Sequence, residues 1–179
     1  YLGTELSVAA QDLRAVLPLG GDLLSAGISD EEAMEAVLPL LQSAKQAEIW
    51  NVKTFPAEEE VLRGRAFDVM LAAYVLNPQR RSFGANELCE DEGIGDFNRC
   101  PAWAVHRLAE MQRVKLNEND LDGIFEDIEM PLAFVLRDIE REGFQVDADL
   151  LREMGISLDK TIASLTDEIA EMMGAKINL

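Results

Sequence analysis

Positive charge is scarce in this sequence. Lys and Arg number 16 against 34 Asp and Glu, which gives a formal net charge of −18 and a sequence pI of about 4.3. Proteins that grip nucleic acid on their own carry a basic face, which neutralises phosphates and releases counterions. The densest basic cluster here is only the pair Arg80 and Arg81. The composition argues against an independent nucleic-acid-binding module, and it assigns no nucleic-acid-contacting residue.

Cysteine, histidine and long apolar runs are also in short supply. The two cysteines, Cys89 and Cys100, lack CxxC spacing and the only histidine is His106, so neither a disulfide framework nor a zinc site is expected. Apolar runs such as Met70–Leu76 fall far short of the roughly 20 residues that cross a bilayer, and residues 1–10 do not resemble a signal peptide. We expect a cytoplasmic chain with no membrane partner, cut from something longer.

The first part of the sequence has the pattern of an α/β domain. Polar and apolar residues alternate from Leu6 and again over Leu13–Leu19, which predicts two strands of a hairpin joined at Gln11-Asp12. Ser29 and Glu32 form a capping box, and apolar residues then recur at helical spacing as far as residue 43. A chain of 179 residues with 48% hydrophobic content is long enough for one such domain and an appended helical segment.

Short apolar runs predict two further strands. The first, Ala47–Trp50, follows the capped helix as in an αβ unit, and the second is Ala66–Asp68. Between them, Pro56 is expected in the first turn of a helix that ends at Gly64. Asp68 is expected to cap the next helix, which runs through Leu76.

From Pro101 the pattern is helical to the end. One helix is predicted from Pro101 to a break at residues 117–120, and a long amphipathic segment with a bend at Pro131 follows and stops at Gly143. Asp147 is a candidate N-cap for a last helix that ends at Gly174. The apolar face of the long segment needs a partner, so a fragment could pair with a copy of itself through that face: Ile124, Ile128, Leu132, Val135, Leu136 and Ile139.

Two ordered blocks resemble bacterial DNA polymerase I. Residues 125–147 are similar to the start of the family's polymerase domain, and Leu150-Leu151 with residues 174–179 are similar to the stretch that leads into its thumb. Gly64–Pro78 resembles the helix that follows the second motif of the family's exonuclease domain. The resemblance implies an incomplete 3′-to-5′ exonuclease-like domain over residues 1–117 and the helical start of a polymerase domain over residues 118–179.

The resemblance also implies a fold and a chemistry. The fold would be α/β, an RNase H-like exonuclease-type domain with a mixed sheet, followed by an all-helical segment. Exonucleases of this fold hold two divalent metals with four carboxylates, which come from motifs of the form DxE, NxKYD and YxxxD. No DxE occurs before Asp30. The NxKYD segment corresponds to Asn51–Phe55, with Phe55 in place of the metal-binding Asp, and YxxxD corresponds to Asp96–Cys100, with both its Tyr and its Asp replaced.

These replacements predict that the domain is catalytically dead. Phe55 offers no oxygen to Mg²⁺, and the thiol of Cys100 is a poor substitute for a carboxylate. We therefore expect no catalytic residue, metal or cofactor in this chain, with Asp68 acting as a cap and His106 as a surface histidine that has no partner acid in register. The Mg²⁺ expected for the parent polymerase belongs to parts after Leu179, and DNA would be contacted through that parent.

The preferred interpretation is thus a structural scaffold for the polymerase domain of a protein of DNA replication and repair. Two alternatives remain. One is an active two-metal proofreading exonuclease whose missing acids come from an upstream strand and from Asp91, Glu92 or Asp96. The other is an acidic helical interaction module with no relation to polymerases.

Overall fold

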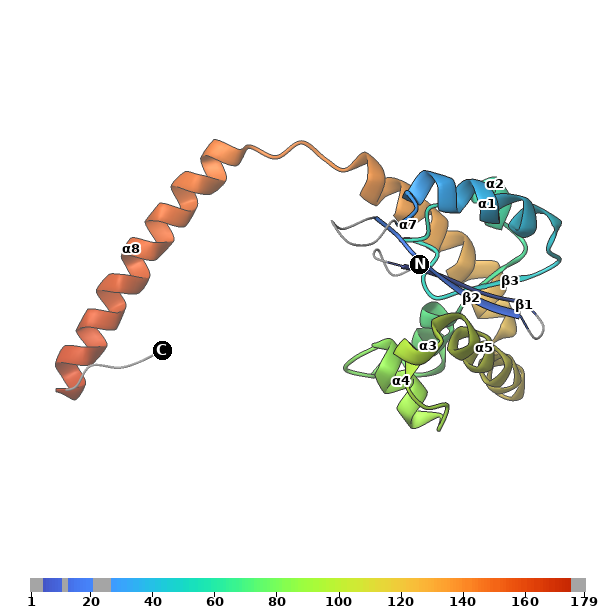
Figure 1. Ribbon diagram of the computed structural model, residues 1–179. Coiled ribbons are helices and arrows are strands. Elements are labelled where there is room, and N and C mark those ends of the chain that lie inside the picture. Colours follow the sequence, from blue (N-terminus) through green and yellow to red (C-terminus); the bar gives the residue numbers. More distant parts are fainter. Residues whose placement is uncertain (1–4, 11–12, 21–26, 175–179) are drawn as a thin grey trace. The chain divides into compact units, whose positions relative to one another are not determined.

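The computed structural model describes residues 5–10, 13–20 and 27–174, and the chain divides into two compact units, unit 1 (Tyr1–Arg141) and unit 2 (Glu142–Leu179) (Figure 1). All described strands precede Val69, and every later element is helical, so the predicted order of an α/β part and a helical part is confirmed. The elements of the first part are β1 (Glu5–Ala10), β2 (Leu13–Pro18), α1 (Asp30–Ser43), β3 (Ala47–Ile49), α2 (Glu59–Leu62), β4 (Ala66–Asp68), α3 (Val69–Leu76) and α4 (Ala85–Asp91). Those of the second part are a 3₁₀ turn (Phe97–Arg99), α5 (Pro101–Glu118), α6 (Asp122–Ile124), a π-helical turn (Phe125–Glu129), α7 (Met130–Glu142) and α8 (Ala148–Met173).

The predicted hairpin and capped helix both form. β1 and β2 pair antiparallel in the register Glu5 to Pro18 through Ala10 to Leu13, and the predicted turn at Gln11-Asp12 lies outside the described residues. Ser29 Oγ accepts the N–H of Glu32, and the Glu32 carboxylate accepts the N–H of Ser29, which completes the capping box. These hydrogen bonds from Ser29 hold the pKa of Glu32 below its ordinary value.

β3 and β4 form a second sheet, which differs from the single mixed sheet that was expected. They run parallel, with Ala47 opposite Ala66 and Ile49 opposite Asp68. Among the described residues each of the two sheets has only two strands. β3 and β4 have three residues each, so their ladder is short. β1 is instead tied to the helical layer through a side chain, because Ser7 Oγ accepts the N–H of Ala102 at 3.1 Å.

The helix after β3 begins later than predicted. Pro56 lies before it, Glu58 is its N-cap residue, and the helix itself spans only Glu59–Leu62. The reason is that Phe55 and Ala57 are buried, so the segment between β3 and α2 runs through the core region as an irregular strap. The other predicted helix boundaries at Asp30, Asp68, Pro101, Asp147 and Gly174 are confirmed.

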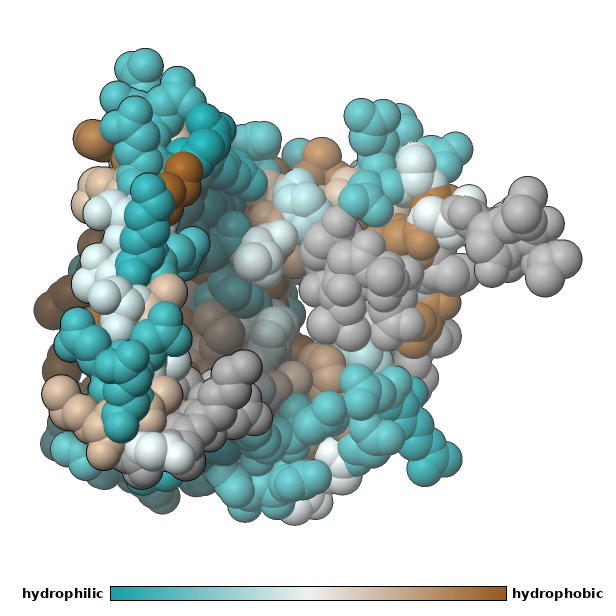
Figure 2. All heavy atoms as spheres, turned by 90° about the vertical axis from the view of Figure 1, so that its left-hand side faces the viewer, coloured by the Kyte–Doolittle hydropathy of each residue, from teal (hydrophilic) through white to brown (hydrophobic). Residues whose placement is uncertain are grey.

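The main hydrophobic core of unit 1 lies between β3, β4, α3, α5 and the π-helical turn. Phe67 of β4 contacts Phe125 of that turn with ring centroids 4.8 Å apart, and Leu108 and Leu116 of α5 are fully buried beside them. A smaller cluster lies between the hairpin and α1. On the face shown in Figure 2, hydrophilic residues are widespread and apolar residues lie among them. No helix of the described residues is both long and apolar enough to cross a membrane.

A π-helical turn marks the point where the long amphipathic segment was predicted to bend. The N–H of Met130 donates to the carbonyl of Phe125, five residues back, instead of four. Pro131 follows directly and has no N–H to give to the carbonyl of Asp127, so the regular hydrogen-bond ladder is already interrupted there. The wider turn accommodates the proline ring without ending the helix.

Asp68 joins three elements of unit 1. Its side chain is 2% exposed and accepts the N–H of Leu71 at 3.0 Å, as the predicted cap of α3, and also the N–H of Val52 at 2.8 Å, just beyond β3. Burial raises the pKa of Asp68 to about 6, although hydrogen bonds from Leu71 and Val52 and the positive charge of Lys53 oppose this rise. The sequence predicted the cap but not the bond to Val52.

We predict that Asp68 makes unfolding depend on pH in a specific direction. Its folded-state pKa of about 6 lies above the ordinary 3.8, so between these values the folded chain keeps a proton that the unfolded chain has released. The stabilisation that this retained proton gives the folded state is fully present below about pH 4 and is lost as the pH rises through 6. The free energy of unfolding changes by an amount on the order of 2–3 kcal/mol.

Urea unfolding of the wild-type chain and Asp68→Asn across this pH range tests the prediction. All other carboxylates are shared, so their effects cancel in the difference. The wild type should lose stability relative to Asp68→Asn as pH rises, and parallel curves would contradict the assignment.

Candidate functional site

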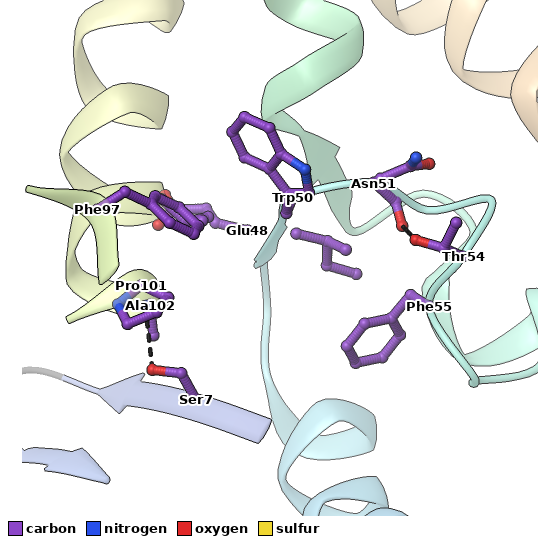
Figure 3. A pocket seen from close by; sticks show the side chains of 11 residues that line it. Ser7, Glu48, Trp50, Asn51, Thr54, Phe55, Phe97, Pro101 and Ala102 are labelled. Atoms are coloured by element: carbon purple, nitrogen blue, oxygen red, sulfur yellow. Dashed lines mark hydrogen bonds between the residues drawn. The ribbon is translucent and has the colours of Figure 1, made fainter. Parts of the chain in front are cut away.

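A small hollow lies at the carboxyl end of β3. The motif positions identified in the sequence predict that the degenerate exonuclease site lies here. Residues from β1, β3, the strap after β3 and the start of α5 line it, and its volume is about 60 Å³. Binding pockets for small molecules usually measure about 300–1,000 Å³, so this hollow is small for a ligand. Figure 3 shows the rings of Trp50, Phe55 and Phe97 around it.

Phe55 occupies the position of the predicted metal-binding carboxylate. Its ring is 8% exposed and belongs to the main core cluster. Trp50 and Phe97 close the other side of the hollow with ring centroids 5.4 Å apart. The Phe55 ring has no donor atom for a hard cation. Among the described residues, the one carboxylate that lines the hollow, that of Glu48, is engaged by His106 and Arg113.

The other two predicted motif positions lie at the start of the helical layer. Asp96 is exposed, and its carboxylate accepts the N–H of Asn98 at 2.9 Å, which caps the 3₁₀ turn. Cys100 is a free, partly buried cysteine at the N-cap position of α5, and its side chain makes no capping hydrogen bond. Phe97, between them, is the residue that reaches the hollow. Sequence reasoning missed Phe97 and Trp50, whose only signal was their aromatic character beside the degenerate motifs.

Asp91, Glu92 and Asp96 are the acids that an active exonuclease would use, and two of them pair with basic side chains. Asp91 forms an ion pair with Arg80, and Glu92 forms one with Lys115. Neither they nor Asp96 line the hollow beside Phe55. Within the described residues, no three His, Cys, Asp or Glu side chains lie close enough together to hold a metal ion.

The expectation that His106 lacks an acidic partner is wrong. Its Nδ1 lies 2.7 Å from the carboxylate of Glu48, on β3, and its Nε2 lies 3.8 Å from Glu110, one turn further along α5. Glu48 also pairs with Arg113, whose guanidinium lies 4.3 Å from the centre of the Phe67 ring. Glu110 lies in helix register with His106, so the sequence could have revealed it, whereas Glu48 comes from a distant segment that register does not reveal.

Two side chains of α7 hold the strap that carries Phe55. Arg137 is 2% exposed, donates from Nη1 to the carbonyl of Ala57 at 3.1 Å, and lies 5.2 Å from the centre of the Phe134 ring. Its Nε makes no hydrogen bond and lies 3.7 Å from the carboxylate of Asp138. At the other end of the strap, Lys53 forms an ion pair with Glu140. The strap is therefore anchored to a helix about 80 residues further along the chain.

We predict that an acid at position 55 destabilises the fold around the hollow and does not create a metal site. Phe55→Asp places a carboxylate among apolar rings and removes ring packing, so it should lower the free energy of unfolding by at least about 3 kcal/mol. Phe55→Leu, the matched apolar control, should cost on the order of 1 kcal/mol.

Thermal unfolding of both variants with and without Mg²⁺ distinguishes a destabilised apolar core from a metal-binding site. A ligand that binds only the folded state raises its stability with concentration. We expect Mg²⁺ to leave the Phe55→Asp curve unchanged. A selective stabilisation of that variant by Mg²⁺ would mean that an oxygen-lined site survives here.

We also predict that the contacts of Arg137 contribute much more to the free energy of unfolding than the ion pair of Lys53 does. Arg137→Ala leaves the buried Ala57 carbonyl without a donor and removes packing on Phe134, so a loss of about 2–4 kcal/mol is expected. Glu140→Gln breaks only the exposed pair with Lys53 and should cost less than about 1 kcal/mol. Chemical denaturation of both variants tests this order, and an equal effect would show that the buried bond is unimportant.

The chain is similar to part of several bacterial DNA polymerases I. It is 30% identical to DNA polymerase I of Bacillus subtilis (strain 168) over 142 residues, which cover 66% of this chain and 16% of that protein. It is 32% identical to the Lactococcus lactis (strain IL1403) protein over 63% of this chain and 16% of that protein. The match to the Pseudomonas aeruginosa protein is 28% identical and covers 92% of this chain and 22% of that protein. No family model matches the chain.

A solved structure supports the same relationship at the level of fold. The chain resembles a structure described as the POL domain of Pol1 from M. smegmatis in complex with DNA primer-template and dNTP, with a TM-score of 0.58 and 23% identity. The match covers 84% of this chain and 28% of that one. The chain is thus a relative of DNA polymerase I that spans about a sixth of the length of the first curated relatives it matches.

Proposed function

We propose that this chain is a segment of a polymerase of DNA replication and repair, in which residues 1–117 form an RNase H-like exonuclease domain without nuclease activity. Residues 118–179 would begin the polymerase domain. The inactive domain would serve as a scaffold for that polymerase domain. The single observation that carries the proposal is the buried Phe55 ring beside the hollow, at the position where the resemblance implies a metal-binding Asp.

The described side chains of this hollow include one carboxylate, that of Glu48, which is too few for phosphodiester hydrolysis by two metals. That reaction needs a tight group of carboxylates, which hold the ions that activate water and stabilise the leaving oxygen. Phe55 supplies an apolar ring, Asp96 is engaged in a backbone cap, and Cys100 offers a thiol. The carboxylates of Asp91 and Glu92 are paired with cations elsewhere on the surface.

A scaffold role fits the way the strap is anchored. Arg137 and Glu140 belong to α7, in the segment predicted to begin the polymerase domain, while Ala57 and Lys53 belong to the exonuclease-like segment. The two predicted domains therefore share hydrogen bonds and ion pairs within compact unit 1. The boundary between these two predicted domains at residue 117 concerns ancestry and function, and it stays a prediction.

The alternative of an active proofreading exonuclease has weaker support. It requires Asp91, Glu92 or Asp96 to leave their present partners and meet near the hollow. The alternative of an acidic interaction module explains the charge of −18 but not the similarity to polymerases.

A nuclease assay tests the proposal. The chain, and the intact polymerase that contains it, would be incubated with a 5′-labelled single strand and Mg²⁺ without nucleotides, beside an active 3′-to-5′ exonuclease as a positive control. We expect no 3′-to-5′ shortening by either protein. A ladder that disappears in Asp91→Asn, Glu92→Gln or Asp96→Asn would overturn the proposal and establish a proofreading site.

A further inference from the structure

A second cavity of unit 1 lies at the amino end of the β3–β4 ladder, the other end of the ladder from the hollow beside Phe55. Its volume is about 320 Å³, and sites for small molecules usually measure about 300–1,000 Å³. The turn before β4, α5, the π-helical turn and the start of α7 line it. The cavity is therefore large enough for a ligand of one or two rings.

The buried part of the lining is apolar and mostly aromatic. The rings of Phe67, Phe125 and Phe134 and the side chain of Met130 all belong to the main core and line the cavity. Aromatic rings favour offset or edge-to-face contact with other rings. These side chains therefore favour a flat apolar body over a branched or strongly polar one.

Positive charge, which is scarce in the chain, gathers at this cavity. Three of its 16 basic residues line it, and they are Arg63, Arg65 and Arg113. The acidic residues of the lining are Glu126 and Asp127, both of which are exposed. Three positive and two negative side chains give the lining a net charge of +1, whereas the chain as a whole carries −18. The lining thus has the opposite sign of charge to the rest of the molecule.

The three guanidinium groups are held in place and still have donors to offer. Arg65 donates from Nη1 to the carbonyl of Gln42 at 2.8 Å, and Arg63 and Arg113 each pair with a glutamate through one terminal nitrogen. A guanidinium has five N–H donors in a planar fork. Each printed contact within the described residues uses one nitrogen of that fork, so further N–H groups of each arginine suit a carboxylate or phosphate.

We propose that this cavity is a binding site for a small anion with a flat aromatic body. The ring would lie against Phe67 and Phe125, and the anionic group would accept N–H groups from the three arginines. Arg113 joins the two halves of the site, because its guanidinium lies 4.3 Å from the centre of the Phe67 ring. The site is separate from the question of nuclease activity, because Asn51–Phe55 and Asp96–Cys100 do not line it.

A cavity of similar volume lies between α3, α4 and α5 and is the rival site. It measures about 310 Å³, but its charged residues neutralise one another, since Arg80 pairs with Asp91 and Lys115 with Glu92. It therefore has no excess of either charge.

The net charge of the whole chain does not prevent an anion from binding. Repulsion between exposed charges is screened over about 8 Å at physiological ionic strength. The arginines that line the cavity lie closer to a bound anion than most of the acids of the chain do. They therefore determine the sign of the charge that the cavity prefers.

An NMR titration of the ¹⁵N-labelled 179-residue chain tests the proposal. The probe is 1-naphthyl phosphate, which has both a flat ring and an anionic group. We expect it to bind with a dissociation constant on the order of 1 mM or lower and to shift the amide signals of residues 63–67 and 125–134. Inorganic phosphate lacks the ring and 1-naphthylmethylammonium has the opposite charge, so both should bind at least about tenfold more weakly.

Matched variants identify the charges that matter. Arg63→Gln should weaken binding of 1-naphthyl phosphate by about fivefold, because it removes one donor fork from the cavity. Arg81→Gln makes the same change of charge at an exposed position outside the cavity and should leave binding unchanged. Glu126→Gln removes a negative charge from the lining and should tighten binding by about twofold. The ¹⁵N spectrum of each variant shows that it is folded.

Equilibrium dialysis of the same probe against the intact polymerase that contains this chain repeats the comparison in the longer protein. Wild type should bind more probe than Arg63→Gln, and Arg81→Gln should match wild type. Equal binding of the ammonium probe or of inorganic phosphate, or unchanged binding in Arg63→Gln of either protein, would overturn the proposal. Signal shifts confined to the cavity between α3, α4 and α5 would overturn it as well.

Discussion

The buried carboxylate of Asp68 is the interaction on which the rest of unit 1 depends. It accepts N–H groups from Leu71 at the start of α3 and from Val52 after β3, so it ties a three-residue parallel ladder to the helix that follows it. Such a short ladder has few backbone hydrogen bonds of its own. Because burial opposes ionisation, these two donors are needed to hold the carboxylate in place. The strap that carries Phe55 starts at this point.

Several acidic residues of unit 1 hold basic side chains or backbone groups in place. Glu48 holds His106 and Arg113 against β3, Glu92 pairs with Lys115, and Asp96 caps a 3₁₀ turn. Exposed pairs of this kind contribute little stability one by one, but each occupies a carboxylate that could otherwise join a metal site. An acid-rich sequence therefore does not imply an acidic reaction centre.

The strap between β3 and α2 is held by side chains of α7. It presents the buried ring of Phe55, and it is anchored by Arg137 and by the pair of Lys53 with Glu140. These anchors come from α7, beyond the predicted domain boundary at residue 117. Buried residues on both sides of the predicted boundary share one core, which is the physical basis of the proposed scaffold role.

The sequence by itself determined the helices other than α2, the caps at Ser29, Asp68 and Asp147, and the relationship to DNA polymerase I, because these depend on residues close together in the chain or on the order of residues. The tertiary structure alone decided the pairing of His106 with Glu48 and the anchoring of Ala57 by Arg137. It also decided that the strands form two separate sheets. These features join segments far apart in the chain, and local patterns carry no record of which distant donor a buried carbonyl or carboxylate will meet.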